Sequence, residues 1–294
     1  MASLKDIRQR IASVKNTQQI TRAMKMVSAA KLRRAQDNIL NLRPYAERIL
    51  SVIADIAVTR RVSHPLLRRE ENPQNILLVV INSDRGLCGG FNNAIHKFTE
   101  KFHEENKDKY QRMDYIFVGR RGAEYFKKRD VNIIDSILNL SKEISYEFCA
   151  GIAKKIMNSY EEGIYDEVRF IYNAFKSAIS QELTTENILP VDISKSELAK
   201  EESSHLFSKD LIFEPAPHQI VDELLHKHFA VQVYRCMSES VAAEHAARMT
   251  AMENATNNAK EMIDSMTLIY NKLRQASITT ELSEITSGAE ALKG

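Results

Sequence analysis

Apolar residues near the start of the chain recur at a helical spacing. They stand three and four positions apart, first at Leu4, Ile7, Ile11 and Val14 and again at Leu32, Ala35, Ile39 and Leu42. This spacing predicts one long helix with a single apolar seam over residues 3 to about 58. Pro44 has no amide donor, so we expect this helix to kink or break near Arg43.

The middle of this seam is polar. The seam positions between the two apolar runs are Gln18, Thr21, Lys25 and Ser28. The apolar residues of the same stretch shift to a neighbouring face, at Ile20, Ala23, Met24, Val27 and Ala30. The pattern therefore leaves two interpretations for Met24, which either packs in the core or faces out of the helix pair.

A second helical pattern fills the end of the chain. From His218 to about Ser287 the sequence contains neither glycine nor proline. Apolar and small residues step three and four positions through Met252, Ala255, Ala259, Met262, Met266, Ile269, Leu273, Ala276 and Thr280. This regularity predicts a coiled-coil seam, and its small members allow another helix to approach closely.

We expect the two long helices to pair with each other. At 1.5 Å per residue they are roughly 80 Å and roughly 105 Å long, which exceeds the width of a domain of ~140 residues. Each has a narrow apolar stripe, so an antiparallel pair buries both. If Val58 and His218 lie level, facing residues have numbers that sum to 276, and Leu4 meets Lys272. Residues beyond Leu273 would overhang and need a partner from another chain.

Residues 75 to about 215 follow an α/β pattern instead. Runs of β-branched and aromatic residues predict strands at Ile76–Asn82, Tyr115–Val118, Val131–Ile134, Val168–Tyr172 and Gln181–Pro190. Amphipathic stretches predict helices near Asn92–Glu105, Arg121–Arg129 and Ser145–Glu162. This order predicts right-handed crossovers and a mostly parallel sheet. The polar stretch Lys195–Ser208 predicts a loop, and the segment Phe213–Pro217, with its two prolines, ends the domain.

The patterns together predict a fold of three parts, in the α/β class. A long N-terminal helix over residues 1–58 and a C-terminal helix over residues 218–288 form an antiparallel coiled coil. A Rossmann-like α/β domain occupies residues 75–215.

Composition excludes several classes of protein. The chain has 294 residues, of which 44% are hydrophobic, enough for a packed core. Its apolar runs are far shorter than the roughly 18 to 20 residues of a membrane span. The three cysteines, Cys88, Cys149 and Cys236, lack CxxC spacing, which argues against a disulfide framework or a metal site.

The net charge of +2 conceals two ends of opposite sign. Residues 1–35 hold nine lysines and arginines against one aspartate, a net +8, whereas residues 219–294 hold seven bases and ten acids, a net −3. The two ends could lie together, the basic helix could bind nucleic acid, or its charges could simply be solvated. An Arg-rich, acid-poor start is also compatible with a transit peptide.

A glycine-rich turn, SDRGLCGGFN at residues 83–92, follows the first predicted strand. Its characteristic residues are Asp84, Arg85, Gly86, Cys88, Gly89 and Gly90. It matches neither the dinucleotide fingerprint nor a P-loop, and Asp84 puts a carboxylate near a helix N-terminus, so we expect no nucleotide or other cofactor. The glycines supply unusual backbone angles, and we expect Asn92 to cap the next helix. Because the segment contains no histidine to act as a base, a packed Cys88 is favoured over a nucleophile.

Three segments of the chain together resemble one family. They are SLKDIRQRIASVKNTQQITRAMKMVSAAKLRRAQ at the start, the turn SDRGLCGGFN, and AARMTAMENATNNA with LIYNKLRQASITTELSEITSGAEAL at the end. Their sequence and order are similar to the gamma subunit of the rotary proton-translocating ATP synthase, bacterial type. The resemblance covers essentially the whole chain and begins by Ser3, so we expect no removable leader.

The resemblance implies a central rotor shaft inside a ring of alpha and beta subunits. The α/β domain would lie outside the ring, beside the epsilon subunit and on the membrane c ring. Proton flow through the c ring would turn the shaft and drive ATP synthesis or hydrolysis at the beta subunits. The chain itself would be non-catalytic, without cofactor or metal, and peripheral at the cytoplasmic face of the bacterial inner membrane.

The resemblance also implies contact residues. Met24 and Lys25 would touch the beta subunits, and Arg274 and Gln275 would make polar contacts with the surrounding ring; the alternative for the second pair is an exposed helix face. The turn would lie near beta or epsilon, and the basic helix would face acidic segments of beta. The redox-active cysteine pair of the chloroplast branch is missing, so we expect no thiol control.

Two rival functions are distinguishable by experiment. A Rossmann-like hydrolase would use Cys88 as its nucleophile and lose activity in the Cys88→Ser variant. A basic coiled coil that binds nucleic acid would show strongly salt-dependent DNA binding.

Overall fold

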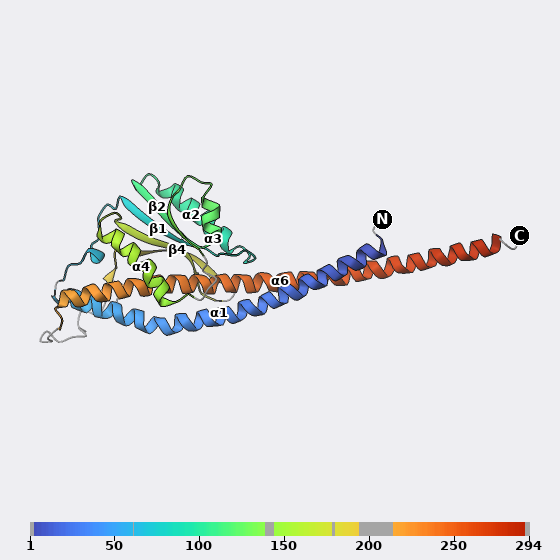
Figure 1. Cartoon of the computed structure of the whole chain (residues 1–294), viewed down its shortest axis with the longest axis horizontal. Coiled ribbons are helices and arrows are strands. Elements are labelled where there is room, and N and C mark those ends of the chain that lie inside the picture. Colours follow the sequence, from blue (N-terminus) through green and yellow to red (C-terminus); the bar gives the residue numbers. More distant parts are fainter. Residues whose placement is uncertain (1–2, 61, 139–143, 178–179, 194–213, 292–294) are drawn as a thin grey trace. The chain divides into compact units, whose positions relative to one another are not determined.

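The computed structural model describes residues 3–60, 62–138, 144–177, 180–193 and 214–291 (Figure 1). The chain divides into two compact units, a smaller one of residues 1–28 and 248–294 and a larger one of residues 29–247. The helices α1 (Leu4–Arg60) and α6 (Pro217–Ala291) contribute residues to both units. The predicted loop Lys195–Ser208 and Phe213 lie outside the described residues.

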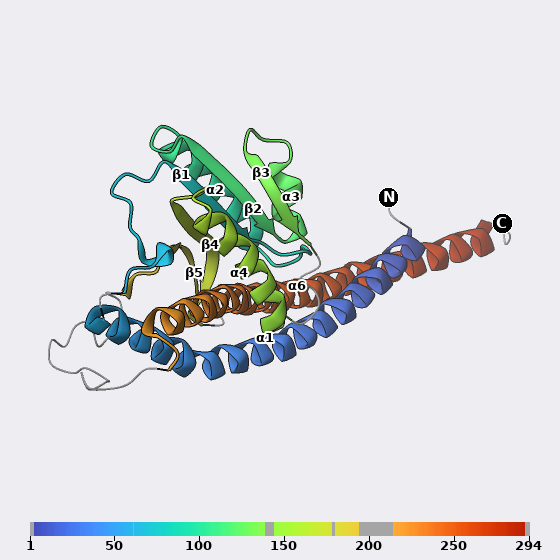
Figure 2. The ribbon, with the colours of Figure 1, turned by 60° about the vertical axis from the view of Figure 1, so that its left-hand side comes forward.

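The larger unit is built on a five-stranded sheet (Figure 2). Its strands, in spatial order, are β3 (Asn132–Ile137), β2 (Arg112–Val118), β1 (Asn75–Ile81), β4 (Glu167–Phe175) and β5 (Gln181–Leu189). β1 pairs in parallel with β2 and β4, with Val79 opposite both Ile116 and Phe170. Only the β4–β5 pair among these strands is antiparallel, so the prediction of a mostly parallel sheet is confirmed.

Helices cover both faces of this sheet. α2 (Phe91–Asn106) and α3 (Arg120–Phe126) pack on one face, and α4 (Tyr146–Glu161) packs on the other with parts of α1 and α6 and the short turn η1 (Pro65–Leu67). Successive residues of β1 point alternately into the two cores. Because both faces are covered, the strand is an unbroken apolar run, which made it recognisable in the sequence.

The prediction for Pro44 was a kink or a break in the helix, and the structure excludes the break. The helix runs from Leu4 to Arg60 with the proline inside it. Ile39 and Ile49 are buried on either side of Pro44. A proline in a helix interior costs about 3 kcal/mol, whereas burying one large apolar side chain contributes about 1.5–3 kcal/mol. Packing of the flanking turns therefore offsets the lost hydrogen bond.

In the smaller unit α1 and α6 form an antiparallel pair. Thr21 Oγ1 lies 2.8 Å from Thr256 Oγ1, and Lys25 Nζ lies 2.6 Å from Glu253 Oε1. The numbers of the paired residues sum to 277 and 278, against the expected 276. The observed register agrees with the predicted one to within two residues.

α6 carries apolar residues on both sides of one seam line, and α1 covers only one side. Four residues that we predicted in the seam are exposed, namely Met262, Ile269, Ala276 and Thr280. Half-buried residues replace them at Ile263, Tyr270 and Ser277. Both sets keep heptad spacing with Ala259, Met266 and Leu273, so the spacing did not decide between them. The side of α6 formed by Met262 and Ile269, which we call the open flank, is left facing solvent.

The end of α6 is exposed over its whole circumference within this unit. Every residue from Ile278 to Glu290 is exposed, including the apolar residues Ile278, Leu282 and Ile285. The observed register places Leu4, the first residue of α1, level with Leu273 or Arg274. The segment from Arg274 onward, which we call the overhang, therefore extends past the start of α1, as we expected.

Candidate partner-binding surfaces

The midsection of α1 places Met24 and Lys25 at the edge of the helix pair. Met24 is half-buried, so its side chain lies between the seam and solvent. Lys25 pairs with Glu253 on α6, and 37% of its side chain remains exposed. Exposed ion pairs contribute about 0–1 kcal/mol, so this pair orients the lysine more than it stabilises the helices.

An apolar stripe on α1 lies next to these residues. Ile20, Met26 and Val27 are 60%, 61% and 57% exposed, and Ala23 and Ala30 are exposed beside them. The sequence pattern placed all of them except Met26 on this face. Large exposed apolar patches on proteins are typical of binding surfaces. The five residues are called the α1 stripe below.

Small polar side chains fill the seam between the two helices. Thr21 and Ser28 are buried. Thr256 Oγ1 lies 2.7 Å from the carbonyl oxygen of Met252, Thr21 Oγ1 lies 3.0 Å from that of Gln18, and the two hydroxyls share a hydrogen bond of 2.8 Å across the seam. Since both hydroxyls are satisfied, the polar seam leaves neither of them without a partner, and the small side chains permit close approach of the helices.

Arg274 and Gln275 lie at the beginning of the overhang and are exposed. Several hydroxyls of the overhang donate to carbonyls one turn earlier in the same helix, at Thr279, Thr280, Ser283 and Thr286. Hydroxyls bonded in this way need no water as acceptor. The overhang is therefore suited to surroundings made of protein.

The glycine-rich turn lies at the carboxyl end of β1. Ser83 Oγ donates to the carbonyl of Arg85 at 2.6 Å, and Asp84 Oδ1 accepts from the amide of Arg120 at 3.1 Å. Leu87 and Gly89 have φ angles of 63° and 57°. Leu87 is 64% exposed, whereas Cys88 is buried. The turn is thus fixed by its own hydrogen bonds and presents Leu87 to solvent.

Asn92 does not cap α2, contrary to the prediction. α2 begins at Phe91, and its N-cap residue Gly90 makes no side-chain hydrogen bond. The side-chain amide nitrogen Nδ2 of Asn92 instead donates to Ser83 Oγ at 2.8 Å and to Cys88 Sγ at 3.2 Å. Asn92 therefore holds the turn closed, and Cys88 is a packed thiol within it.

Two glycines that the sequence did not single out close this end of the sheet. A Cβ on Gly122 would lie 2.2 Å from Asn82 Oδ1. A Cβ on Gly119, where φ is +110°, would lie 2.3 Å from the carbonyl oxygen of Asn82. α3 therefore begins against the end of β1 only because both residues lack a side chain. This contact fixes the position of the turn.

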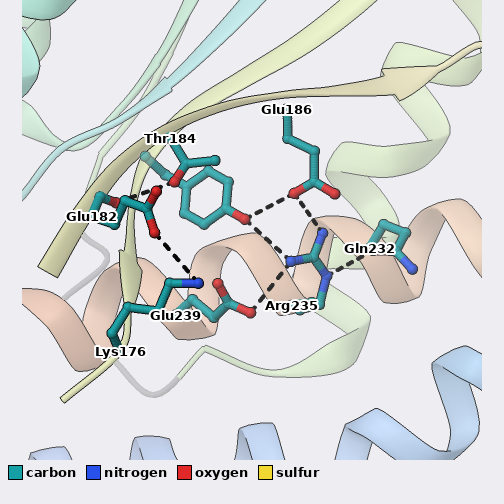
Figure 3. Close-up of polar contacts among 8 residues, drawn as sticks. Lys176, Glu182, Thr184, Glu186, Gln232, Arg235 and Glu239 are labelled. Carbon is teal, nitrogen blue, oxygen red and sulfur yellow. Dashed lines mark hydrogen bonds and ion pairs between the residues drawn. The ribbon is translucent and has the colours of Figure 1, made fainter.

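A half-buried ion cluster joins α6 to β4 and β5 (Figure 3). Arg235 on α6 donates to Glu186 on β5 at 2.8 Å, to Tyr172 Oη on β4 at 3.1 Å and to Glu239 at 3.3 Å. Its Nε donates to Gln232 at 2.7 Å, and Tyr172 donates to Glu186 at 2.9 Å. Sequence reasoning missed this cluster because the partners on the strands lie 49 and 63 residues away from Arg235.

The remaining cysteines are buried free thiols. Cys149 Sγ lies 3.3 Å from the sulfur of Met237. Burial raises the pKa of both Cys149 and Cys236 to about 12. Both thiols are therefore protonated at neutral pH and poorly disposed to react.

Among the described residues, no helix combines the length and hydrophobicity needed to cross a bilayer. The same residues contain no group of three or more histidine, cysteine or carboxylate side chains arranged to hold a metal ion.

Comparison with known proteins gives one consistent result. A family model described as ATP synthase matches residues 3–292. Proteins named ATP synthase gamma chain from Bdellovibrio bacteriovorus and Geobacter metallireducens are 62% and 48% identical to this chain, over the full length of both chains in each case.

Solved structures agree with these sequence matches. A chain in the central stalk/c-ring structure of the Tetrahymena thermophila mitochondrial ATP synthase is 28% identical, with a TM-score of 0.62 over 80% of this chain and 99% of that chain. A chain from the Euglena gracilis mitochondrial enzyme, 23% identical, has a TM-score of 0.66 over 98% and 94% of the two chains and shares the fold. The chain therefore belongs to the ATP synthase gamma chain family.

Proposed function

We propose that this chain is the central rotor shaft subunit of an ATP synthase. It couples proton flow through the membrane c ring to ATP synthesis or hydrolysis at the beta subunits. The observation that carries the proposal is the antiparallel α1–α6 pair, from which α6 continues as an overhang with exposed apolar residues. The full-length identity of 62% to a relative named ATP synthase gamma chain supports it.

The smaller unit would act as the shaft within a ring of alpha and beta subunits. Its surface is not uniform: the α1 stripe, the Lys25–Glu253 pair and the open flank differ in chemistry. As the shaft turns, each beta subunit would meet these surfaces in succession. The contact free energy would then favour different beta conformations at different angles, which is the requirement for shifting a conformational equilibrium.

The proposed contact residues lie on this unit. Met24 and Lys25 would touch the beta subunits, and their half-exposed positions beside the α1 stripe support this role. Arg274 and Gln275 would make polar contacts with the surrounding ring, which their exposure at the start of the overhang supports.

The turn would be a second contact region, near beta or epsilon. Asp84, Arg85, Gly86, Cys88, Gly89 and Gly90 would form it. Because Asp84 is bonded to the start of α3 and Cys88 is buried, these two residues would shape the turn, and the exposed Leu87 would lie at its surface.

The division of the chain would follow these roles. Residues 1–58 and 218–288 would be the shaft helices, and residues 75–215 would form the α/β domain. That domain would lie beside the epsilon subunit and on the c ring. The chain would be peripheral at the cytoplasmic face of the bacterial inner membrane, and no nucleic acid is proposed as a partner.

The chain would be non-catalytic, with the chemistry confined to beta. Co-expression with alpha and beta subunits tests this. We expect the chain to co-purify with both, the isolated chain to hydrolyse no ATP, and Cys88→Ser to leave hydrolysis by the complex unchanged. ATP hydrolysis by the isolated chain that Cys88→Ser abolishes would instead establish the hydrolase alternative.

The overhang provides a second test. Deleting residues 273–294 should weaken assembly or torque while leaving urea unfolding of the larger unit unchanged. A substitution variant with serine at Ile278, Leu282 and Ile285 should act in the same direction. The matched control has serine at Glu281 and Glu284, on the same exposed turns, and should assemble normally. Equal loss of assembly and of α/β stability would contradict the proposed role of the overhang.

A further inference from the structure

A cavity of about 480 Å³ lies beside the turn in the larger unit. It is open to solvent and is lined by turn residues 86–89, by the first turns of α2 and by α3 with the residues that follow it. This is the carboxyl end of β1, the edge of the sheet at which open α/β folds bind ligands. Small-molecule sites have volumes of about 300–1000 Å³, so the cavity is large enough for one.

The charged side chains that line the cavity are mainly cationic. Arg121, Lys128 and Arg129 line it, against a single lining carboxylate, Glu124. A guanidinium nitrogen of Arg121 lies 3.9 Å from a carboxylate oxygen of Glu124, which makes a loose ion pair. Arg129, by contrast, forms a close ion pair with Glu100. Gly86 allows the guanidinium of Arg121 to lie over the turn, 3.4 Å from the position of a Cβ. Two of the three cations are thus available to a ligand without giving up a close ion pair.

His96 supplies an independent indication of a ligand. It lines the cavity with only 5% of its surface exposed, and neither ring nitrogen has a hydrogen-bond partner among the described residues. Its ring stacks on Tyr125, with centroids 4.0 Å apart. A buried polar group left without a partner destabilises the fold, so a ligand that accepts a hydrogen bond from its N–H would remove that penalty.

The state of His96 is also defined by its surroundings. Burial, and then the positive charge of Arg129, lower its pKa to about 4. The imidazole is therefore neutral at pH 7 and offers one N–H donor and one acceptor nitrogen.

The residue that caps the N-terminus of α2 has no side chain with which to do so. α2 has 16 residues, and its N-cap Gly90 has no side chain to satisfy the first amides. Asn92 and Asn93 of its first turn line the cavity. The carboxylate of Asp84, which we expected to repel an anion here, is bonded to the amide of Arg120 at the start of α3. The amides of the first turn of α2, with the positive end of the helix dipole, can therefore contribute to an anion site in this cavity.

We propose that this cavity binds a small, multiply charged anion of the phosphate class. Arg121 and Lys128 provide charge-assisted hydrogen bonds, the first turn of α2 provides amide donors, and His96 provides a neutral N–H. The absence of dinucleotide and P-loop glycine spacing in the turn argues for a compact phosphorylated molecule over a dinucleotide. Because turn residues 86–89 line this site, it adjoins the contact region proposed above, but phosphate binding does not depend on the shaft role.

Titration of the full-length chain with inorganic phosphate tests the proposal. The readout is the ring resonances of His96 by NMR, at pH 7.5 and at constant ionic strength maintained with chloride. We expect a saturable shift, and we expect Arg121→Gln and Lys128→Gln each to weaken phosphate binding about tenfold, since each removes a charge-assisted bond. Because both side chains are exposed, these variants should fold as the parent does.

A matched control separates the site from general charge attraction. Lys127 precedes Lys128 and is equally exposed but does not line the cavity, so Lys127→Gln should leave phosphate affinity within twofold of the parent. His96→Phe keeps the stacking on Tyr125 and removes the N–H, and it should weaken the phosphate-induced rise in unfolding temperature. An unsaturable shift, the same response to chloride, an equal effect of Lys127→Gln, or saturation by an acidic peptide but not by phosphate would overturn the proposal.

Discussion

Thr21 and Thr256 meet hydroxyl to hydroxyl, 2.8 Å apart, at the centre of the α1–α6 pair. One turn further along α1, Lys25 meets Glu253. The two contacts set the same antiparallel register to within one residue, so they identify which residues of α1 and α6 face each other in this unit.

This register predicts a specific cross-link. Thr21→Cys combined with Thr256→Cys should form a disulfide under mild oxidation, because the two side chains already touch. A changed mobility on non-reducing gels measures it. Ile20→Cys with Thr256→Cys is the control and should not cross-link, since Ile20 is 60% exposed on another face. Efficient cross-linking of the control pair, or none of the first pair, would refute the register.

Glycine at position 122 is required by packing. Gly122→Ala should lower the free energy of unfolding by about 2–4 kcal/mol, because the new Cβ would lie 2.2 Å from Asn82 Oδ1. Gly151→Ala is the matched control, since it is also helical and its Cβ would meet no atom within 4 Å. That control should raise stability by about 0.5–1 kcal/mol. Urea unfolding distinguishes the two, and similar effects would contradict this account.

Removing Arg235 should leave two half-buried carboxylates without their cation. We expect Arg235→Met to lower the free energy of unfolding by about 1–3 kcal/mol, because Glu186 and Glu239 lose their partner. Lys227→Met, on the same helix, breaks only the exposed pair with Glu223 and should cost less than about 0.5 kcal/mol. Adding Glu186→Gln to Arg235→Met should recover part of the loss. Full additivity of these two changes would show that the cluster does not act as a unit.

The buried His228 predicts a loss of stability in mild acid. Burial, and then the charge of Arg235, lower the pKa of His228 to about 4, against about 6.5 in the unfolded chain. At pH values between these two pKa values, His228 is protonated in the unfolded state and neutral in the folded state, so the free energy of unfolding falls as the pH falls below about 6.5. From pH 7 to pH 5 the loss from one such histidine is at most about 2 kcal/mol.

Urea unfolding at several pH values tests this prediction. His228→Phe should be less sensitive to the change from pH 7 to pH 5 than the parent chain. His218→Phe, at an exposed position near the start of the same helix, should retain the sensitivity of the parent. If the free energies of unfolding of His228→Phe and of the parent change in parallel with pH, the pKa of His228 is not lowered by folding.

The strands and the helix register were predictable because their causes are local. β1 is apolar on both faces, which marks a central parallel strand, and the α1 pattern fixed its seam residues one by one. The register followed from one assumption, that Val58 and His218 lie level at the two ends of the intervening domain. Counting residues from these positions along each helix gives the facing pairs, which differ from the observed contacts by no more than two residues.

The errors arose where two local solutions were equally good. Met262 and Ile263 both fit a heptad with Ala259 and Met266, and only the position of α1 selects Ile263. Asn92 is a good N-cap residue, yet Ser83 and Cys88, brought back by the turn, compete for its carboxamide. The Arg235 cluster depends on strand pairing over long sequence distances. Such contacts have no periodic signature in the sequence.

The open flank of α6 has a consequence for how the chain is handled before it reaches its complex. Met262, Ile269 and the exposed Leu268 give the newly synthesised chain an exposed apolar surface, which a second copy of the chain can cover. Copies made in excess of the partner subunits are therefore prone to aggregate. A cell that makes this protein must keep its output matched to that of the subunits that enclose it.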